Sequence, residues 1–241
     1  MRNIGEGIWI FERQFRFLGA EFGNRMTVVR LGNEELFIHS PIALDDELKS
    51  QVEKLGRVVH IVTPNAFHGL FVEDWISAFP FARHFTAKGG RQDREFLSID
   101  LSDSTTSAFS PTLEVIHVQG IPKLNEFAFF HKVSRTLILT DLAFNIGKNV
   151  SYWTKIFFSL NGAYGKFGPS RLMRSMIEDQ ATLKDSLMKM YEWDFDRIVV
   201  SHGDIVEKDG KETMRSAFQQ CLANSSNRHR TASLRSPIRC G

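Results

Sequence analysis

Short strand-like runs alternate with amphipathic helical segments along this chain, and the alternation occurs in two similar rounds. The first round holds runs at residues 26–31 and 35–40, a helical pattern in LDDELKSQVEKLG and an apolar run at residues 58–63. The second holds LEVIHVQG, EFAFFHK and RTLILTD, a mostly helical stretch over residues 150–191 and the strand-like DRIVVSHGD. Strands that alternate with helices favour layered α/β folds over bundles and all-β sandwiches. We therefore predict an α/β protein built from two related halves.

The composition is that of an ordinary globular protein. Of the 241 residues, 42% are apolar and 24% are charged, so the chain can bury a sizeable core and is neither disordered nor fibrous. No apolar run approaches the roughly 18 to 20 residues of a membrane span, and charges interrupt the first apolar positions too early for a secretory signal. We therefore expect a cytoplasmic protein.

The charge is unevenly distributed along the chain. The formal net charge is +2, but residues 224–241 hold four arginines and no acid, which leaves residues 1–223 at 2 − 4 = −2. Basic residues in a Ser/Asn-rich terminus are typical of a solvated tail rather than of a nucleic-acid-binding face. We predict one folded domain over residues 1–223 and a disordered basic tail over 224–241. We expect a small-molecule substrate, and neither nucleic acid nor a membrane as a partner.

The two cysteines, Cys221 and Cys240, provide neither a disulfide framework nor a Cys-based zinc site. The sequence also contains no phosphate-binding Gly-rich loop, no G-x-G-x-x-G after a strand, no G-x-S-x-G and no H-E-x-x-H. These absences exclude the simplest nucleotide, dinucleotide, serine-hydrolase and zincin sites. Any metal must be bound by histidines and carboxylates.

Three strand-like runs end next to residues that can bind a metal. HIVT is followed closely by His68, LILT by Asp141 and IVVS by His202. In layered α/β folds, ligands gather just outside the carboxyl ends of strands, so these three side chains can converge. Two histidines and one carboxylate are a donor set for catalytic zinc or for non-haem iron. The sequence predicts one divalent metal ion, with zinc favoured over iron or manganese, or a cleft that holds none.

Each of these residues also has a structural interpretation. His68 is equally suited to packing a turn, Asp141 to capping a helix and His202 to the turn before Gly203. Glu126 opens the EFAFF strand, where it is either a fourth acidic group near the cleft or a solvated strand start. His60 and His117 lie within apolar strands, so we expect them to be core residues.

The order of these motifs resembles the metallo-β-lactamase superfamily of αββα metallohydrolases. The segments MTVVRL, ELFIHSPI, VTPNAFH and SRTLILTDL are most similar to a branch known only as a domain of unknown function. The resemblance covers about residues 5–222. It implies a four-layer αββα sandwich and a metal-dependent hydrolase.

The first motif of the superfamily, Thr-His-x-His-x-Asp-His, is altered in this chain. Laid on TPNAFHG, it places Pro64 and Ala66 where two metal-binding histidines belong, and His68 where the aspartate belongs. Asp141 matches the bridging aspartate and His202 the final histidine, while Glu126 falls near the Gly-His-Thr segment. The resemblance therefore implies a degenerate, mononuclear site.

These patterns lead to three hypotheses about function. The first is a hydrolase of ester-like, amide-like or phosphoester bonds that binds metal through His68, Asp141 and His202, with Asp141 and Glu126 as catalytic residues. The second is a non-catalytic binding protein on the same scaffold, and the third is redox chemistry at one iron. The aromatic segment 152–167 is either a lid over the cleft or part of the core.

Overall fold

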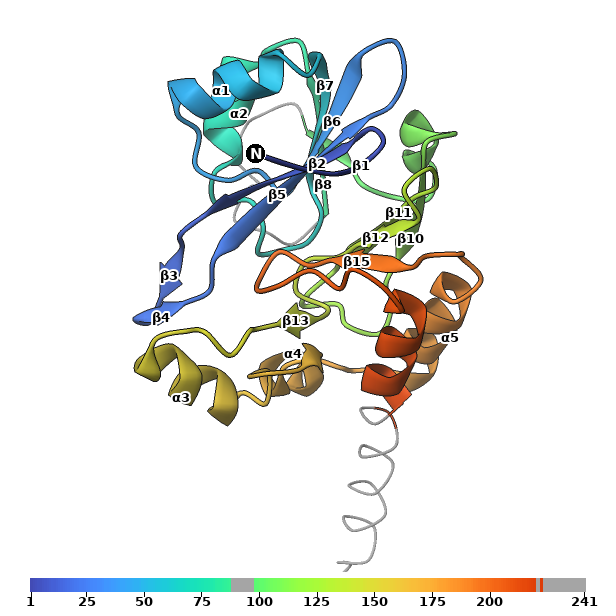
Figure 1. Cartoon of the computed structure of the whole chain (residues 1–241). Coiled ribbons are helices and arrows are strands. Elements are labelled where there is room, and N and C mark those ends of the chain that lie inside the picture. The colour runs from blue at the N-terminus through green and yellow to red at the C-terminus, as the bar shows by residue number, and fades with distance from the viewer. Residues whose placement is uncertain (88–97, 220–221, 223–241) are drawn as a thin grey trace, which may run out of the picture.

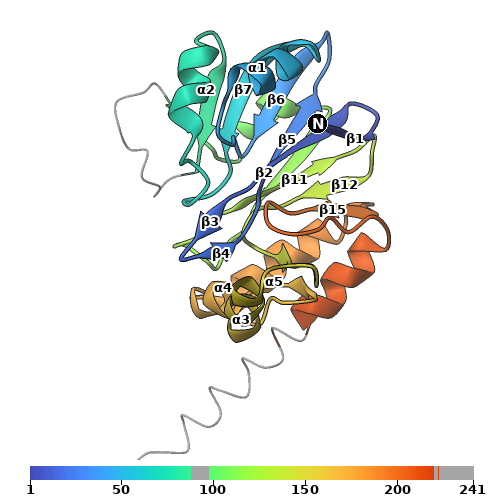
Figure 2. The ribbon, with the colours of Figure 1, turned by 60° about the vertical axis from the view of Figure 1, so that its left-hand side comes forward.

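Two β-sheets packed face to face form the centre of the protein, and helices cover their outer faces (Figures 1 and 2). The computed structural model describes residues 1–87, 98–219 and 222. The expected tail over residues 224–241 lies outside the described residues. The layers run helix, sheet, sheet, helix, which confirms the predicted αββα sandwich.

The first sheet contains seven strands. In spatial order they are β1 (Arg2–Gly5), β2 (Ile8–Arg13), β5 (Asn24–Arg30), β6 (Glu35–His39), β7 (Arg57–Thr63), β8 (Arg83–Thr86) and β9 (Ser98–Asp100). The strands from β1 to β6 pair antiparallel, and those from β6 to β9 pair parallel. Parallel pairing places the ends of β6 and β7 at the same edge of the sheet.

The second sheet contains four strands. Their order is β10 (Leu113–His117), β11 (Phe127–His131), β12 (Thr136–Ile138) and β15 (Arg197–Val199). The last two strands, β12 and β15, are parallel neighbours, with Ile138 opposite Val199. The residues that follow these two strands therefore leave the sheet at the same edge.

The outer layers are helical. Over the first sheet lie α1 (Asp46–Glu53) and α2 (Val72–Ala78), and over the second lie α5 (Gln180–Met190) and the helical residues 210–219. The side chain of Asp45 accepts a hydrogen bond from Leu48 N at 2.7 Å and caps α1, whose Leu48 and Val52 are buried. Capping and an apolar stripe thus fix this helix against the sheet.

Three apolar clusters hold the layers together. The cluster between the sheets joins Phe37 and Phe85 of the first sheet to Phe129 and Ile138 of the second, with Phe109 of the 3-10 helix η1 (Thr106–Phe109) packed among them. The other two clusters lie between each sheet and its helices. The interior therefore consists of one continuous stack, and the site lies at the edge of this stack.

Smaller elements extend from the edge of the sandwich. A two-stranded hairpin of β3 (Arg16–Phe17) and β4 (Ala20–Glu21) lies beside α3 (Tyr152–Leu160), and both figures show them at the same end of the molecule. A second short pair, β13 (Phe144–Asn145) and β14 (Phe167–Gly168), lies near α4 (Arg171–Ser175). The predicted helical stretch over residues 150–191 is therefore three separate helices.

The first strands of the fold, β1 and β2, were not predicted from the sequence. The run Ile8–Phe11 is buried at all four positions, so it lacks the alternation that distinguishes a half-exposed strand. The hairpin of β5 and β6 and the strands β7, β10, β11, β12 and β15 form where the sequence predicts them. In the part of the chain that the structure describes, no helix is long and apolar enough to cross a membrane.

Three buried histidines predict a loss of stability in acid. Burial lowers the pKa of His60, His84 and His131 from 6.5 to about 4. Between these values the unfolded chain binds more protons than the folded chain, so the free energy of unfolding falls as the pH drops from 6.5 towards 4. We expect His60→Gln to reduce this slope by up to about 1.4 kcal/mol per pH unit in urea unfolding. Parallel curves for the variant and the wild type would show that His60 does not contribute.

Candidate metal centre

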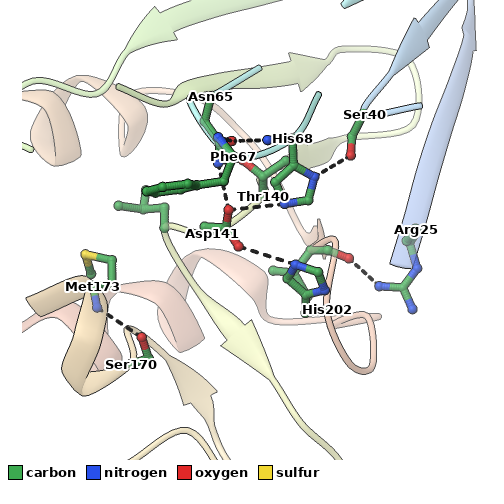
Figure 3. A network of polar contacts seen from close by, with 12 residues as sticks. Arg25, Ser40, Asn65, Phe67, His68, Thr140, Asp141, Ser170, Met173 and His202 are labelled. Carbon is green, nitrogen blue, oxygen red and sulfur yellow. Dashed lines mark hydrogen bonds and ion pairs between the residues drawn. The ribbon is translucent and has the colours of Figure 1, made fainter. Parts of the chain in front are cut away.

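Three side chains from distant parts of the chain meet at the edge of the two sheets (Figure 3). His68 Nε2 lies 3.1 Å from Asp141 Oδ2, and His202 Nε2 lies 3.4 Å from Asp141 Oδ1. All three side chains are mostly buried, with exposed fractions of 7%, 15% and 8% in that order. Each offers one ligand atom, and these atoms lie within 4.8 Å of one another. The structure thus brings together the three residues that the strand ends predict.

The positions of these side chains follow from the strands before them. Asp141 and His202 come after the parallel neighbours β12 and β15, while His68 lies in the turn between β7 and α2. That turn is ordered by Asn65, whose Oδ1 accepts hydrogen bonds from Phe67 N and His68 N, both at 2.9 Å. Such side-chain turns are a common use of asparagine.

The outer nitrogen of each imidazole ring is already engaged. His202 Nδ1 lies 2.8 Å from the carbonyl oxygen of Gly23, and His68 Nδ1 lies 2.6 Å from Ser40 Oγ. A carbonyl can only accept, so the proton of neutral His202 is on Nδ1 and its Nε2 presents a lone pair. Ser40 can donate or accept and therefore suits either form of His68. In metal sites, such outer hydrogen bonds orient the ligating ring.

The charges of His68 and Asp141 favour a cation between the imidazole ring and the carboxylate. Burial alone raises the pKa of Asp141, but the charge of His68 and the hydrogen bonds from both histidines hold it well below its usual value. Burial alone lowers the pKa of His68, yet the charge and hydrogen bond of Asp141, with the charge of Glu126, raise it overall. The site therefore stabilises a cation between ring and carboxylate, whether a proton or a metal ion.

Glu126 lies deeper than we expected. Its side chain is fully buried, and its carboxylate accepts hydrogen bonds from the backbone N–H groups of Thr140 at 2.8 Å, Asp141 at 2.8 Å and Leu142 at 3.0 Å. The amide of Asn65 donates to the same carboxylate at 3.1 Å and to Asp141 Oδ2 at 2.9 Å. This geometry argues against Glu126 as a ligand or base, because its oxygens are directed at the turn that carries Asp141.

The charge of Glu126 depends on a balance within this network. Burial and the charge of Asp141 raise the pKa of Glu126, while its hydrogen bonds from Thr140 and Asn65 lower it. The net direction is upward. The hydrogen bonds to this carboxylate therefore do not fully offset the cost of burying its charge beside Asp141.

Arg25 fixes the loop that carries His202. This arginine on β5 lies beside the His202 loop in Figure 3 and is only 6% exposed. Its guanidinium donates to the carbonyl oxygens of Val200 and, at 2.6 Å, of Gly203. Glu12 pairs with the same guanidinium, with 3.0 Å between Arg25 Nε and Glu12 Oε1. The first sheet therefore holds the His202 loop through backbone carbonyls on both sides of the histidine.

Ser40, Asn65 and Arg25 also belong to this site and were not predicted from the sequence as part of it. The position of Asn65 could have been recognised, because an asparagine two residues after a strand end suits an ordered turn. The roles of Ser40 and Arg25 could not, because their contacts join residues that are far apart in sequence. Ser40 has a φ of +56°, an uncommon conformation for a non-glycine residue, at the end of β6.

Aromatic rings cover His202 on two sides. Phe144 stacks on the imidazole at 5.5 Å, and Phe22 meets it edge-on at 5.6 Å. Phe157 and Phe158 of α3 contact Phe22 in turn. Of the aromatic residues that we considered as a lid, Phe158 is therefore a core residue, whereas Tyr152 and Trp153 are exposed.

A cavity of about 330 Å³ adjoins the His202 loop. It lies between the ends of β2 and β5 and the loop around Lys148, and its lining includes Glu12, Glu21, Arg25 and Asp204. The three candidate ligands do not line it. Gly23 and the His202 loop lie between this space and the three candidate ligands.

Comparison with solved structures identifies the architecture. The chain matches a metallo-beta-lactamase from Pontibacter korlensis with a TM-score of 0.63 and 13% identity, covering 92% of this chain and 98% of that one. The chain has the metallo-β-lactamase fold. A metallo-beta-lactamase from Erythrobacter litoralis matches with a TM-score of 0.57 and 11% identity over 94% and 91% of the two chains. The metallo-beta-lactamase FIM-1 from Pseudomonas aeruginosa, in a mono-zinc form, matches with a TM-score of 0.59 and 12% identity, covering 92% of this chain and 93% of that one.

Sequence comparison adds a match to a family without a known function. Residues 5–90 match the domain of unknown function DUF4336, as the resemblance of the first strands predicts. No curated protein matches the sequence. Within the metallo-β-lactamase fold, this chain keeps His68, Asp141 and His202 together, while Pro64 and Ala66 supply no ligand atom.

The contacts of Glu126 predict that it stabilises the fold. In Glu126→Gln, an NH2 group must face backbone donors, which leaves at least one buried N–H without an acceptor. We expect the free energy of unfolding to fall by about 1–3 kcal/mol in urea titration. The matched control is Glu192→Gln, because Glu192 is exposed. Unchanged stability together with lost activity would instead support a catalytic role for Glu126.

Proposed function

We propose that this protein is a metal-dependent hydrolase with a mononuclear centre formed by His68, Asp141 and His202. One observation carries the proposal: Nε2 of His202 and an oxygen of Asp141 face each other at 3.4 Å while the Nδ1 proton of that ring is committed to Gly23. Two lone pairs at this distance repel unless a cation, either a proton or a metal ion, lies between them. His68 Nε2 completes the group from the other oxygen of Asp141.

The donor set suits a catalytic divalent metal. Ligands about 2.0–2.1 Å from a tetrahedral zinc lie about 3.3 Å apart. His68 Nε2 lies 3.1 Å from Asp141 Oδ2 and His202 Nε2 lies 3.4 Å from Asp141 Oδ1, and the three ligand atoms as a set lie within 4.8 Å of one another. Two imidazoles and one carboxylate also suit iron and manganese. Three protein ligands leave a coordination position for water or substrate, as catalytic sites require. The mono-zinc form of FIM-1 supports the idea that one ion can occupy this fold.

The chemistry of such a centre is hydrolytic. A divalent metal bound here would lower the pKa of a bound water towards 7 and polarise an ester-like, amide-like or phosphoester group. Asp141 supplies the negative charge that balances the ion, and Asn65 fixes one of its oxygens at 2.9 Å. Ser40 and Gly23 hold the two rings, and Phe22 and Phe144 cover His202 on two sides.

A non-catalytic binding protein on the same scaffold is the second candidate. The substitution of Pro64 and Ala66 for two ligands of the superfamily motif favours it, because paired metals stabilise the developing negative charge in two-metal hydrolases. Asn65, between these two positions, donates its hydrogen bonds to Glu126, Thr140 and Asp141 and offers no replacement ligand. A single ion must therefore supply all the electrostatic stabilisation.

Metal content separates the two candidates. We expect about one zinc, iron or manganese ion per wild-type chain by plasma mass spectrometry after purification without an affinity metal. Asp141→Ala should contain none, because it removes the carboxylate that both histidines face. A chelator should lower the melting temperature of the wild type only, since a metal bound by the folded state alone stabilises it.

The control for this experiment is Asp185→Ala, because Asp185 is an exposed carboxylate on α5. Metal retained by Asp141→Ala would refute the assigned centre. Metal absent from the wild type, with no effect of added zinc on the melting temperature, would favour the binding protein.

If the wild type contains metal and Asp141→Ala does not, the metal-loaded wild type should be screened against esters, lactones and phosphodiesters. Asp141→Ala is the inactive reference in this screen.

A further inference from the structure

An apolar face is exposed where α3 meets the β3–β4 hairpin. On α3, Tyr152, Ile156 and Leu160 are spaced four residues apart and therefore share one side of the helix, beside Trp153. Tyr152 is 79% exposed, Leu160 67% and Trp153 52%, and Ile156 is partly exposed. The opposite side of the helix is the packed one, with Thr154 and Phe158 buried.

The hairpin extends this face. Its tip carries Phe17 and Leu18, which are 54% and 70% exposed. Trp153 Nε1 donates to the carbonyl oxygen of Leu18 at 3.0 Å, and Glu21 N donates to Thr154 Oγ1 at 2.9 Å, so helix and hairpin form one unit. We call the surface made of these side chains the apolar face; it consists of Phe17, Leu18, Tyr152, Trp153, Ile156 and Leu160.

The chain around α3 is strongly basic. Residues 142–177 contain no Asp or Glu and have five cationic side chains, namely Lys148, Lys155, Lys166, Arg171 and Arg174. The remainder of residues 1–223 therefore has a net charge of −2 − 5 = −7. Within the described residues, none of the five forms an ion pair. Exposed apolar side chains and cations without an ion pair thus occur together on α3, on the loops beside it and on α4.

This combination favours a lipid surface over other partners. Amphipathic helices that bind membrane interfaces have aromatic and aliphatic residues on one side and Lys or Arg beside them. Tryptophan and tyrosine prefer the interface between water and lipid. A symmetric dimer through this face would place the five cations near the same five cations of the second copy. A nucleic acid would match the charge but gains little from aliphatic side chains such as Leu18, Ile156 and Leu160.

We propose that the apolar face docks the protein onto anionic phospholipid membranes, with α3 in the plane of the interface and the surrounding cations on the lipid phosphates. The sequence expectation of no membrane partner relied on the lack of an apolar span. The absence of a span does not exclude a local surface of this kind. The docking does not depend on the metal centre.

Trp153 provides a direct reporter of docking. The other three tryptophans, Trp9, Trp75 and Trp193, are at most 8% exposed. On addition of vesicles of phosphatidylcholine mixed with phosphatidylglycerol, the emission of the full-length protein should move to shorter wavelength. Lipids brominated in the acyl chains should quench it, and Trp153→Phe should abolish both changes. Vesicles of phosphatidylcholine alone should give a much smaller response, and salt should reverse the binding.

Matched variants test which residues are responsible. Leu160→Ser and the pair Lys155→Glu with Lys166→Glu should each weaken vesicle binding at least about tenfold in co-sedimentation. The controls make the same changes on α5, as Met188→Ser and as Lys184→Glu with Lys189→Glu, all at exposed positions. These substitutions should leave vesicle binding and the melting temperature unchanged.

Several results would overturn the proposal. They are no binding to anionic vesicles, equal losses in the α5 controls, or an emission change that survives Trp153→Phe. Binding of single-stranded RNA through Lys155 and Lys166 without vesicle binding would assign the face to nucleic acid. A dimer lost in Leu160→Ser without vesicle binding would assign it to a second copy. Because no readout uses metal or substrate, failure here leaves the proposed hydrolase untouched.

Discussion

The site depends on the position of one buried carboxylate, that of Asp141. Its backbone N–H is bound by Glu126, its Oδ2 accepts a hydrogen bond from Asn65, and its two oxygens face His68 and His202. Asn65 and His68 follow a strand of the first sheet, whereas Asp141 and His202 follow strands of the second. The packing of one sheet on the other therefore determines whether the ligand group exists at all.

The sequence predicts the architecture and the three candidate ligands for a simple physical reason. Apolar strands that stop at His, Asp or Asn mark the sheet edge where polar groups are tolerated. This pattern consists of residues that are neighbours in sequence, so it can be recognised without the tertiary structure. The supporting contacts are not local. Ser40 reaches His68 from 28 residues away, and the Arg25 guanidinium reaches the Val200 carbonyl from 175 residues away. Nothing at position 25 distinguishes a buried arginine from an exposed one.

Glu126 shows how a sequence pattern can leave the role of a residue open. From the sequence, an acidic residue at a strand start beside the cleft is a candidate metal ligand. In the structure, the carboxylate oxygens of Glu126 instead accept hydrogen bonds from the backbone N–H groups of the Thr140–Leu142 turn. Backbone donors that have no other partner make a buried carboxylate a structural element. Their positions follow from tertiary structure and not from residue type. Glu126 thus supports the candidate metal centre through its contacts with the turn that carries Asp141.

The central claim is that the three converging acceptors hold one cation. The most direct test is a crystal structure of the zinc-loaded protein with anomalous diffraction measured at the zinc absorption edge. We predict one anomalous peak about 2.0–2.2 Å from His68 Nε2, an oxygen of Asp141 and His202 Nε2. A map without a peak at this position, or with zinc bound only elsewhere, would contradict the account.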